Sequence, residues 1–233
     1  MEIRLLAGGS LRHYAGMIVS HGRRYIFVHI PKTGGTALAL SLEARAMAQD
    51  LMLGDTPKAQ RRRKRLAGIP TAGRKWKHTT LADGIGLYTA QQAHSYFTFT
   101  LVRNPWDRLV SYYHWLQDQA FAHPAVQSAQ QHDFRSFLSL PHIQRSLSAH
   151  PYTSYMQLPD GEVCCRAFLR LEHLAEDIAP LEAHLGFALS PLPVANSSRR
   201  RRDYRSYYDS ALAELVGQVC AADIARFGYR FED

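Results

Sequence analysis

The segment that most constrains the fold is an apolar run that ends in a turn with two glycines and continues into strong helix formers. Residues 25–30 are β-branched or aromatic apart from one histidine, and the run stops at Pro31. This composition predicts a buried strand that ends in a loop. Residues 37–47 consist mainly of Ala and Leu, and their apolar side chains recur on one helical face. The predicted order is strand, glycine turn, helix.

A second segment repeats this order. Residues 97–102 alternate large apolar residues with threonine and are followed by Arg103. Asn104 can cap a helix whose first turn holds Pro105 and, at its third position, Asp107. These residue types predict another strand, a tight turn and another helix.

The C-terminal part of the chain continues the alternation. Residues 166–171 form a third strand candidate, and residues 172–185 form a helical stretch that Pro180 breaks or kinks. A last helix is expected from about residue 206 to residue 227. Strands that alternate with helices predict an α/β fold with a central parallel β-sheet flanked by helices on both faces.

Length and composition predict a single domain over residues 1–233. The chain is about one and a half times a typical domain of ~150 residues. Its 46% hydrophobic and 21% charged residues argue against a disordered or fibrous chain. Residues 54–73 are the exception, because Pro, Gly and the basic run at 61–65 leave few apolar side chains to pack. We expect a mobile surface loop there.

The net charge indicates the class of binding partner, and the cysteine content indicates the cellular compartment. The formal net charge of +8 would attract an anionic ligand at neutral pH. Three cysteines, of which Cys164 and Cys165 are neighbours, cannot form a disulfide framework and fit a reducing compartment. No stretch approaches the ~18 apolar residues of a membrane span. We therefore expect a cytoplasmic, soluble protein without a membrane span.

The first turn has the chemistry of an anion site. Gly34 and Gly35 allow backbone amides to surround an anion, and the positive end of the following helix points to the same place. Lys32 adds a full charge, while Thr33 and Thr36 add hydroxyl donors. An ordinary strand-to-helix turn is the alternative interpretation.

The turn differs from that of a nucleotide triphosphatase. In that signature the lysine follows the glycines, whereas Lys32 precedes them. Such enzymes also need an acidic residue to hold magnesium, but the second strand ends in Arg103. No Cys, His or Asp spacing resembles a metal site either. We therefore expect an anion site and no metal.

The second turn offers a further anion contact. Arg103 at the strand end and Ser111 on the helix could serve one phosphate, the arginine through a bidentate pair and the serine through its hydroxyl. A structural arginine and an incidental serine are the alternative.

Together the two turns resemble sulfotransferases that use 3′-phosphoadenosine 5′-phosphosulfate (PAPS). Residues 29–36, His-Ile-Pro-Lys-Thr-Gly-Gly-Thr, resemble the 5′-phosphosulfate loop of that family, and residues 103–113 resemble its 3′-phosphate motif. The likeness continues in residues 168–174, 192–198 and 223–231. It is closest to bacterial members allied to carbohydrate sulfotransferases, and it implies a P-loop-NTPase-like sulfotransferase fold.

The resemblance also implies roles for individual residues. The 5′-phosphosulfate would be held by Lys32, Thr33, Gly34, Gly35, Thr36 and Ala37. The 3′-phosphate would be held by Arg103 and Ser111. Ser198 and Arg200 would belong to a loop that closes over the nucleotide. Lys32 would also steady the bridging oxygen as its bond to sulfur breaks.

The acceptor hydroxyl needs a general base, and His78 is the first candidate. Relatives carry a histidine or glutamate between the two phosphate motifs, and a neutral imidazole near pH 7 suits the task. His29 and Asp83 are the alternatives.

The resemblance implies sulfuryl transfer from PAPS to an acceptor hydroxyl, with adenosine 3′,5′-bisphosphate as product. It further implies a carbohydrate acceptor, and the basic run at 61–65 fits an anionic glycan, although a solvated loop is the simpler interpretation. Residues 54–73 and 117–157 are expected to be the variable loops that shape the acceptor site. Two other functions stay open, a P-loop-type phosphoryl-transfer kinase and a non-enzymatic basic nucleic-acid-binding module. The second would use Tyr204, Tyr207 and Tyr208 beside the arginines at 199–202, but we expect no nucleic-acid partner.

Overall fold

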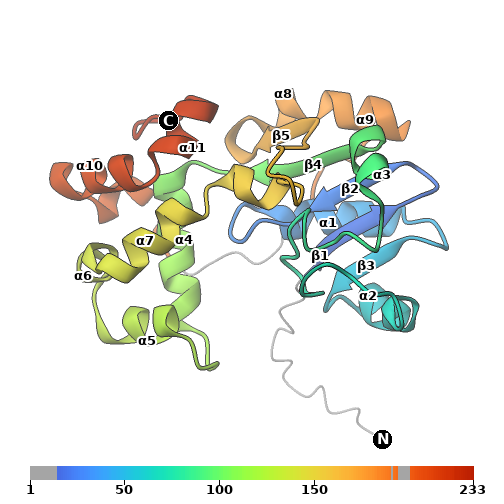
Figure 1. Ribbon diagram of the computed structural model, residues 1–233. Coiled ribbons are helices and arrows are strands. Elements are labelled where there is room, and N and C mark those ends of the chain that lie inside the picture. The colour runs from blue at the N-terminus through green and yellow to red at the C-terminus, as the bar shows by residue number, and fades with distance from the viewer. Residues whose placement is uncertain (1–14, 190, 194–199) are drawn as a thin grey trace, which may run out of the picture.

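The protein is built on a five-stranded sheet with the strand order β3-β1-β2-β4-β5 (Figure 1). The computed structural model describes residues 15–189, 191–193 and 200–233. The strands are β1 (Ala15–Ser20), β2 (Tyr25–Val28), β3 (Leu51–Gly54), β4 (Phe97–Val102) and β5 (Ala167–Arg170). The three strands expected from the sequence, β2, β4 and β5, are confirmed.

The sheet is mixed, so the expected parallel sheet is wrong in part. β2, β4 and β5 pair in parallel, but β1 is antiparallel to both β2 and β3. The physical reason is the turn at residues 21–24, which joins β1 to β2. A connection this short can only form a hairpin, whereas parallel neighbours need a long crossover.

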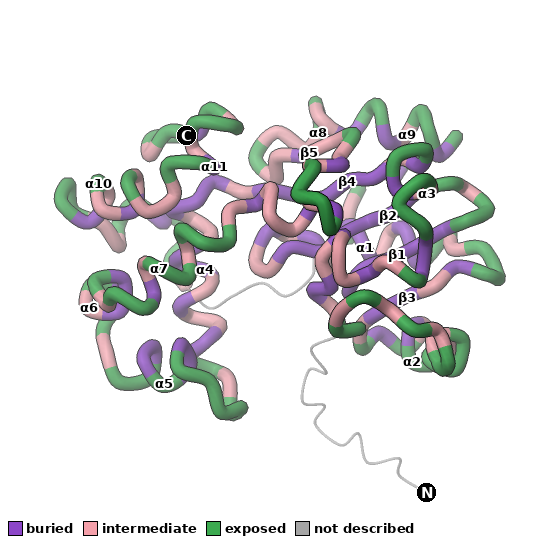
Figure 2. Tube along the Cα trace, viewed as in Figure 1, coloured by how far each residue is buried: buried purple, intermediate pink, exposed green. Residues whose placement is uncertain are grey.

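The two faces of the sheet are covered differently. Side chains alternate between the faces, so Tyr25 and Phe27 lie on one side and Ile26 and Val28 on the other, all at most 1% exposed. The first face packs against α1 (Gly35–Ala44) and α9 (Ala179–Leu185). The second face packs mainly against the loop around residues 81–88, α3 (Ala90–Ser95) and the 3₁₀ segment η2 (Tyr152–Met156). Figure 2 shows the resulting burial along the strands.

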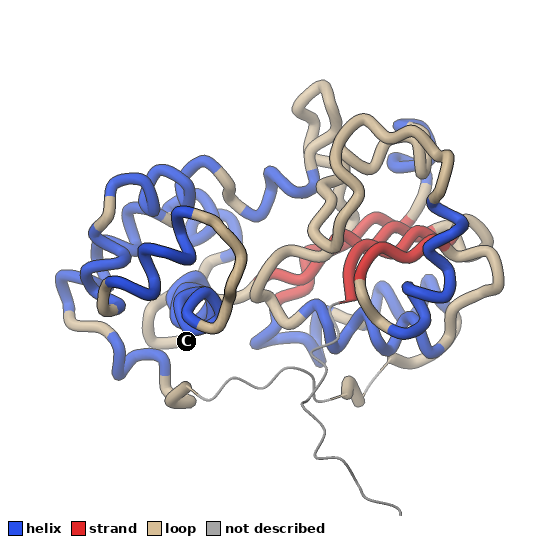
Figure 3. Tube along the Cα trace, turned by 90° about the horizontal axis from the view of Figure 1, so that it is seen from below, coloured by secondary structure: helices blue, strands red, loops and turns tan. Residues whose placement is uncertain are grey.

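A separate helical cluster lies beside the sheet, as Figures 1 and 3 show from two directions. It packs one hydrophobic core around Trp106, Tyr113 and Phe137. Its members are α4 (Pro105–Gln117), α5 (Pro124–Gln131), α6 (Phe134–Ser139), α7 (Pro141–Ala149), η4 (Tyr204–Tyr207), α10 (Ser210–Val219) and α11 (Ala221–Phe227). Residues 117–157, expected to form variable loops, thus contain three α-helices and η2.

The expected C-terminal helices are interrupted. The helix predicted over 206–227 starts at Ser210 and divides at Cys220, which caps α10 and precedes α11. The stretch from 172 to 185 divides into η3 (Leu171–His173), α8 (Leu174–Asp177) and α9. Its break lies at Ile178, two residues before Pro180, because proline restricts the residues ahead of it and fits the first turn of a new helix.

The expected mobile loop at 54–73 is wrong over its first half. It contains α2 (Pro57–Arg62) and η1 (Arg63–Leu66). Thr56 caps α2 by accepting a hydrogen bond from Ala59 N at 3.1 Å, and Pro57 occupies its first position. Arg62 Nη1 donates to Met47 O at 2.8 Å. The cap signal at Thr56 and Pro57 therefore outweighs the charge repulsion of the basic run.

Among the helices of the described residues, none has both the length and the apolar composition of a membrane span.

Candidate active site

The loop after β2 bends through two residues with left-handed backbone conformation. Lys32 has φ 67° and Gly34, the cap of α1, has φ 85°. Such bends turn successive N–H groups toward one concave surface, which suits an anion, and the first amides of α1 face the same region. A Cβ on Gly34 would lie 2.8 Å from Leu171 Cδ1, and one on Gly35 would lie 2.3 Å from His29 Cδ2. Gly34 is therefore required by its left-handed backbone, and Gly35 by the close approach of the His29 ring.

This loop forms one wall of a cavity of about 350 Å³, and the second motif forms another. The sequence-predicted residues that line it are Lys32, Gly34, Gly35, Thr36, Ala37, His78, Arg103 and Ser111. Parallel pairing of β2 with β4 explains why the motifs meet, because it brings the carboxyl ends of both strands to the same edge of the sheet.

Thr33 and Ser198 stand apart from this set. Thr33 is fully buried and does not line the cavity, because its hydroxyl donates to Ile30 O at 2.9 Å and braces the turn from inside. Ser198 lies outside the described residues.

The guanidinium of Arg103 is only partly engaged by the protein. Its Nε donates to Asp107 Oδ2 at 2.8 Å, its Nη2 donates to the same oxygen, and its Nη1 donates to Lys32 O at 3.3 Å. An arginine has five N–H donors, so one donor on each Nη remains for a ligand. Donors on two neighbouring nitrogens of a guanidinium can pair with two oxygens of one phosphate.

Arg200 reaches the same carboxylate from the other side. Its Nη2 is ion-paired with Asp107 Oδ1, and the Arg200 side chain is only 10% exposed. Its Nη1 is buried and has no hydrogen-bond partner among the described residues. Arg200 does not line the cavity, but Asp107 links it to Arg103.

His78 is held in a defined orientation. Its ring is 9% exposed and its Nδ1 lies 2.8 Å from His29 O. A carbonyl oxygen only accepts, so Nδ1 carries the proton and Nε2 is left with a lone pair. Burial and the neighbouring His29 hold the pKa of His78 well below its usual range. His78 is thus a neutral imidazole at pH 7, as a base must be.

The two alternative bases differ in position. His29 lines the same cavity, and its ring centroid lies 4.8 Å from that of His78. Asp83 does not line the cavity. Geometry therefore leaves His29 as the only alternative of the two beside the anion loop.

Three residues without a predicted role also shape the site. Lys77 and Trp115 line the cavity, and the Nζ atoms of Lys32 and Lys77 lie 5.7 and 5.6 Å from the centroid of the Trp115 ring. Arg108 Nε donates to Pro31 O at 3.1 Å, so α4 is tied directly to the anion loop. Positions 108, 111 and 115 are three and four residues apart and so share one face of α4, which is the signal that the sequence offers for Arg108 and Trp115. Burial lowers the pKa of Lys77, which sequence alone does not reveal.

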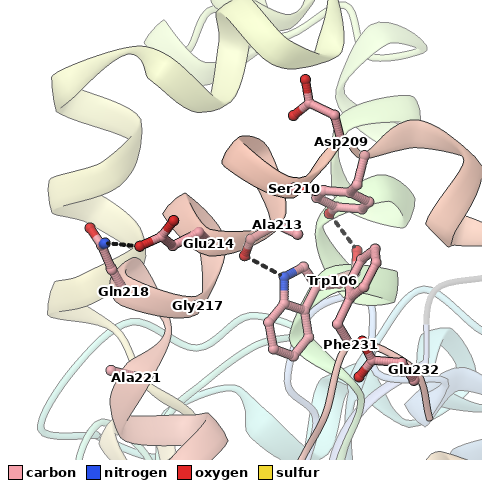
Figure 4. A pocket seen from close by; sticks show the side chains of 11 residues that line it. Trp106, Asp209, Ser210, Ala213, Glu214, Gly217, Gln218, Ala221, Phe231 and Glu232 are labelled. Carbon is pink, nitrogen blue, oxygen red and sulfur yellow. Dashed lines mark hydrogen bonds between the residues drawn. The ribbon is translucent and has the colours of Figure 1, made fainter.

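A larger hollow of about 830 Å³ lies elsewhere, along α10 and α11 (Figure 4). Trp106 Nε1 donates to Ala213 O at 2.9 Å there, and Gln218 Nε2 donates to Glu214 Oε1 at 3.4 Å. These bonds join residues of its own lining, and none of the sequence-predicted site residues lines it. We place the candidate active site at the smaller cavity for this reason.

Comparison with known proteins agrees with the two motifs. No curated protein and no solved structure matches the chain. The family model described as "Sulfotransferase family" matches residues 15–230, a span that includes both motifs and every strand of the sheet. The chain therefore belongs to the sulfotransferase family.

Proposed function

We propose that the protein transfers a sulfuryl group from PAPS to an acceptor hydroxyl. The observation that carries the proposal is the meeting of Lys32, His78, Arg103 and Ser111 around one cavity. These residues come from separate parts of the chain, and each has the chemistry that one part of the reaction requires.

The residues present fit a donor with two phosphate ends. The anion loop and Lys32 suit the 5′-phosphosulfate, while the two remaining Arg103 donors and the Ser111 hydroxyl suit the 3′-phosphate. Arg200 is a further candidate, because its buried Nη1 has no partner among the described residues. The donor supplies a sulfuryl group bound to a phosphate oxygen, which is a good leaving group once its charge is stabilised.

The chain would supply charge stabilisation and proton removal. As the acceptor oxygen attacks sulfur in line, His78 Nε2 accepts the hydroxyl proton. The bond between sulfur and the bridging phosphate oxygen breaks, and Lys32 with the loop amides stabilises the charge that remains on that oxygen. The products are the sulfate ester of the acceptor, an imidazolium at His78 and adenosine 3′,5′-bisphosphate.

The finer identity of the acceptor rests on the family resemblance. We infer a carbohydrate hydroxyl, because the motifs are most similar to those of bacterial relatives of carbohydrate sulfotransferases. The free thiols at Cys164, Cys165 and Cys220 fit a reaction in the reducing cytoplasm.

Ligand binding to wild type and Arg103→Ala tests the donor. Calorimetric titration should give metal-independent binding of adenosine 3′,5′-bisphosphate to wild type. Arg103→Ala should bind it at least ~30-fold more weakly, since losing a charge-assisted phosphate contact costs about 2 kcal/mol or more. Affinity for adenosine 5′-monophosphate should hardly change.

Two results would contradict the assignment. Equal losses for both ligands would mean that Arg103 supports the fold or the 5′ side rather than the 3′-phosphate. Binding of ATP with magnesium in place of the bisphosphate would favour the kinase alternative.

A further inference from the structure

The positive charge of this protein is concentrated in one segment beside the active site. Residues 54–78 contain nine Lys and Arg and a single acidic residue, Asp55. The formal net charge of this segment is therefore +8, equal to that of the entire chain, and the rest of the sequence is neutral overall. A general need for solubility would not confine the charge to about one tenth of the residues.

Carbonyl oxygens position several of these cations. Arg62 donates to Met47 O at 2.8 Å, and Lys75 Nζ donates to Ile69 O at 2.6 Å. Carbonyl oxygens orient a cation but carry no formal charge, so the field of the segment persists. The ion pair within the segment joins Arg63 to Asp55 at 3.4 Å, and both side chains are more than half exposed. Solvent weakens such a pair strongly, so Arg63 can exchange its partner.

The segment also forms a cavity of about 410 Å³ that adjoins the active site. Arg63, Leu66, Lys75 and Trp76 contribute to its lining. Trp76 is 39% exposed, and its ring centroid lies 5.1 Å from that of His78. Since His78 and Lys77 line the active-site cavity, a chain-like ligand bound beside Trp76 would place one of its groups at the proposed general base.

We propose that this cavity and the exposed cations of α2 and η1 form an accessory site for an anionic saccharide. The inference rests on the proposed function and extends it to the acceptor. Units next to the reacting sugar would carry carboxylate or sulfate groups, which bind around Arg63, Lys64 and Lys75. The reacting hydroxyl then lies at His78.

The surroundings of Trp76 favour a saccharide over a nucleic acid. The Arg74 guanidinium carbon lies 5.1 Å from the centre of the Trp76 ring, and the His78 ring contacts it at an interplanar angle of 88°. Nucleobases bind to such grooves chiefly by stacking on aromatic faces, and the Arg74 guanidinium over the Trp76 ring competes with a stacked base. The site therefore offers charge more than a stacking platform.

The test compares two double variants with equal loss of charge. Arg63→Gln/Lys64→Gln alters exposed cations of η1 and keeps good helix formers. Arg145→Gln/Arg230→Gln alters exposed cations elsewhere and is the matched control. Titrations at 25 to 200 mM salt would use a chondroitin sulfate hexasaccharide, neutral cellohexaose and a single-stranded oligothymidylate.

We expect the sulfated hexasaccharide to bind wild type, with cellohexaose at least ~10-fold weaker. Arg63→Gln/Lys64→Gln should weaken hexasaccharide binding at least ~5-fold and flatten its salt dependence, since two exposed ionic contacts are lost. The control should differ from wild type by less than about twofold. Equal binding of the two saccharides, or equal losses in both variants, would overturn the proposal. Tighter binding of the oligothymidylate would also overturn it, in favour of a nucleic-acid site.

Failure of this inference can be told from failure of the proposed function. Adenosine 3′,5′-bisphosphate would be titrated into the same preparations, and both double variants should bind it like wild type. If the bisphosphate does not bind, but the saccharide binds and its binding depends on Arg63, the proposed donor is rejected and the accessory site is retained. The reverse pattern would reject only the accessory site.

Discussion

At the scale of single residues, the proposed chemistry depends on how His78 is held. Its Nδ1 proton is committed to His29 O at 2.8 Å, which leaves Nε2 as the acceptor of a proton. His78→Ala should lower kcat by about 10²–10⁴-fold and leave the Kd for the bisphosphate nearly unchanged, because proton removal matters in the transition state. Steady-state rates and titration of the same preparation would measure both quantities.

The matched control is Asp83→Asn, which removes a carboxyl group that does not line the cavity. Its turnover should stay near that of wild type. Near-normal turnover in His78→Ala would instead return the role of the base to His29 or to solvent.

The pH dependence of the reaction rate follows from the burial of His78. Since the active form of a base is deprotonated, the rate falls as pH drops through the pKa of the folded protein. Burial and the neighbouring His29 hold the pKa of His78 well below its usual range. The acid limb of kcat/KM should therefore have its midpoint below about 6.5, the value of an unperturbed histidine. A midpoint at or above that value would argue against His78 as the titrating group.

At the scale of elements, the Thr56 hydroxyl makes two of the contacts that anchor the basic segment. Thr56 Oγ1 accepts from Ala59 N at 3.1 Å and donates to the buried Glu43 carboxylate at 2.8 Å. Thr56→Ala should lower the free energy of unfolding by about 2–3 kcal/mol, because it removes a helix cap and a donor to a buried carboxylate. Thr56→Ser should recover most of the loss. Urea unfolding would measure both variants, and an unchanged midpoint in Thr56→Ala would mean that α2 is not docked through this contact.

At the scale of the whole molecule, the C-terminal helix is connected to the active site. Asp223 of α11 accepts from Tyr152 N at 2.8 Å, and Tyr152 OH donates to Arg103 O at 2.6 Å. The Arg108 guanidinium lies over the Tyr152 ring, 4.8 Å from its centroid. The helical cluster and the anion site therefore share one hydrogen-bonded network.

This network gives a prediction about stability and pH. Burial raises the pKa of Asp223 from 3.8 to about 6. A raised carboxyl pKa means that folding favours the protonated form. Its contribution to stability is thus full below about pH 4 and is lost as pH rises through about 6. The unfolding free energy of Asp223→Asn minus that of wild type should therefore increase by about 2–3 kcal/mol when the pH is raised from 4 to 7. Urea unfolding at both pH values measures the change, and a pH-independent difference would contradict the prediction.

Local sequence signals were sufficient to predict the elements around the site. The apolar run at 25–30, the glycines of the turn and the Asn104-Pro105 start predicted β2, α1, β4 and α4, because strand composition and helix caps act over a few residues. Both turn motifs and the family were recognisable for the same reason. Local signals that were overlooked, such as the Thr56-Pro57 cap, explain the missed α2.

Tertiary structure alone decided how these elements are used. The reversed direction of β1 depends on pairing with β2 and β3, and a single sequence does not state pairing partners. Burial and neighbours far along the chain decide three further features. Thr33 does not line the cavity, Asp107 is shared by Arg103 and Arg200, and the pKa of His78 is lowered. Desolvation and charge contacts at such distances are properties of the packed molecule, so only the folded chain could reveal them.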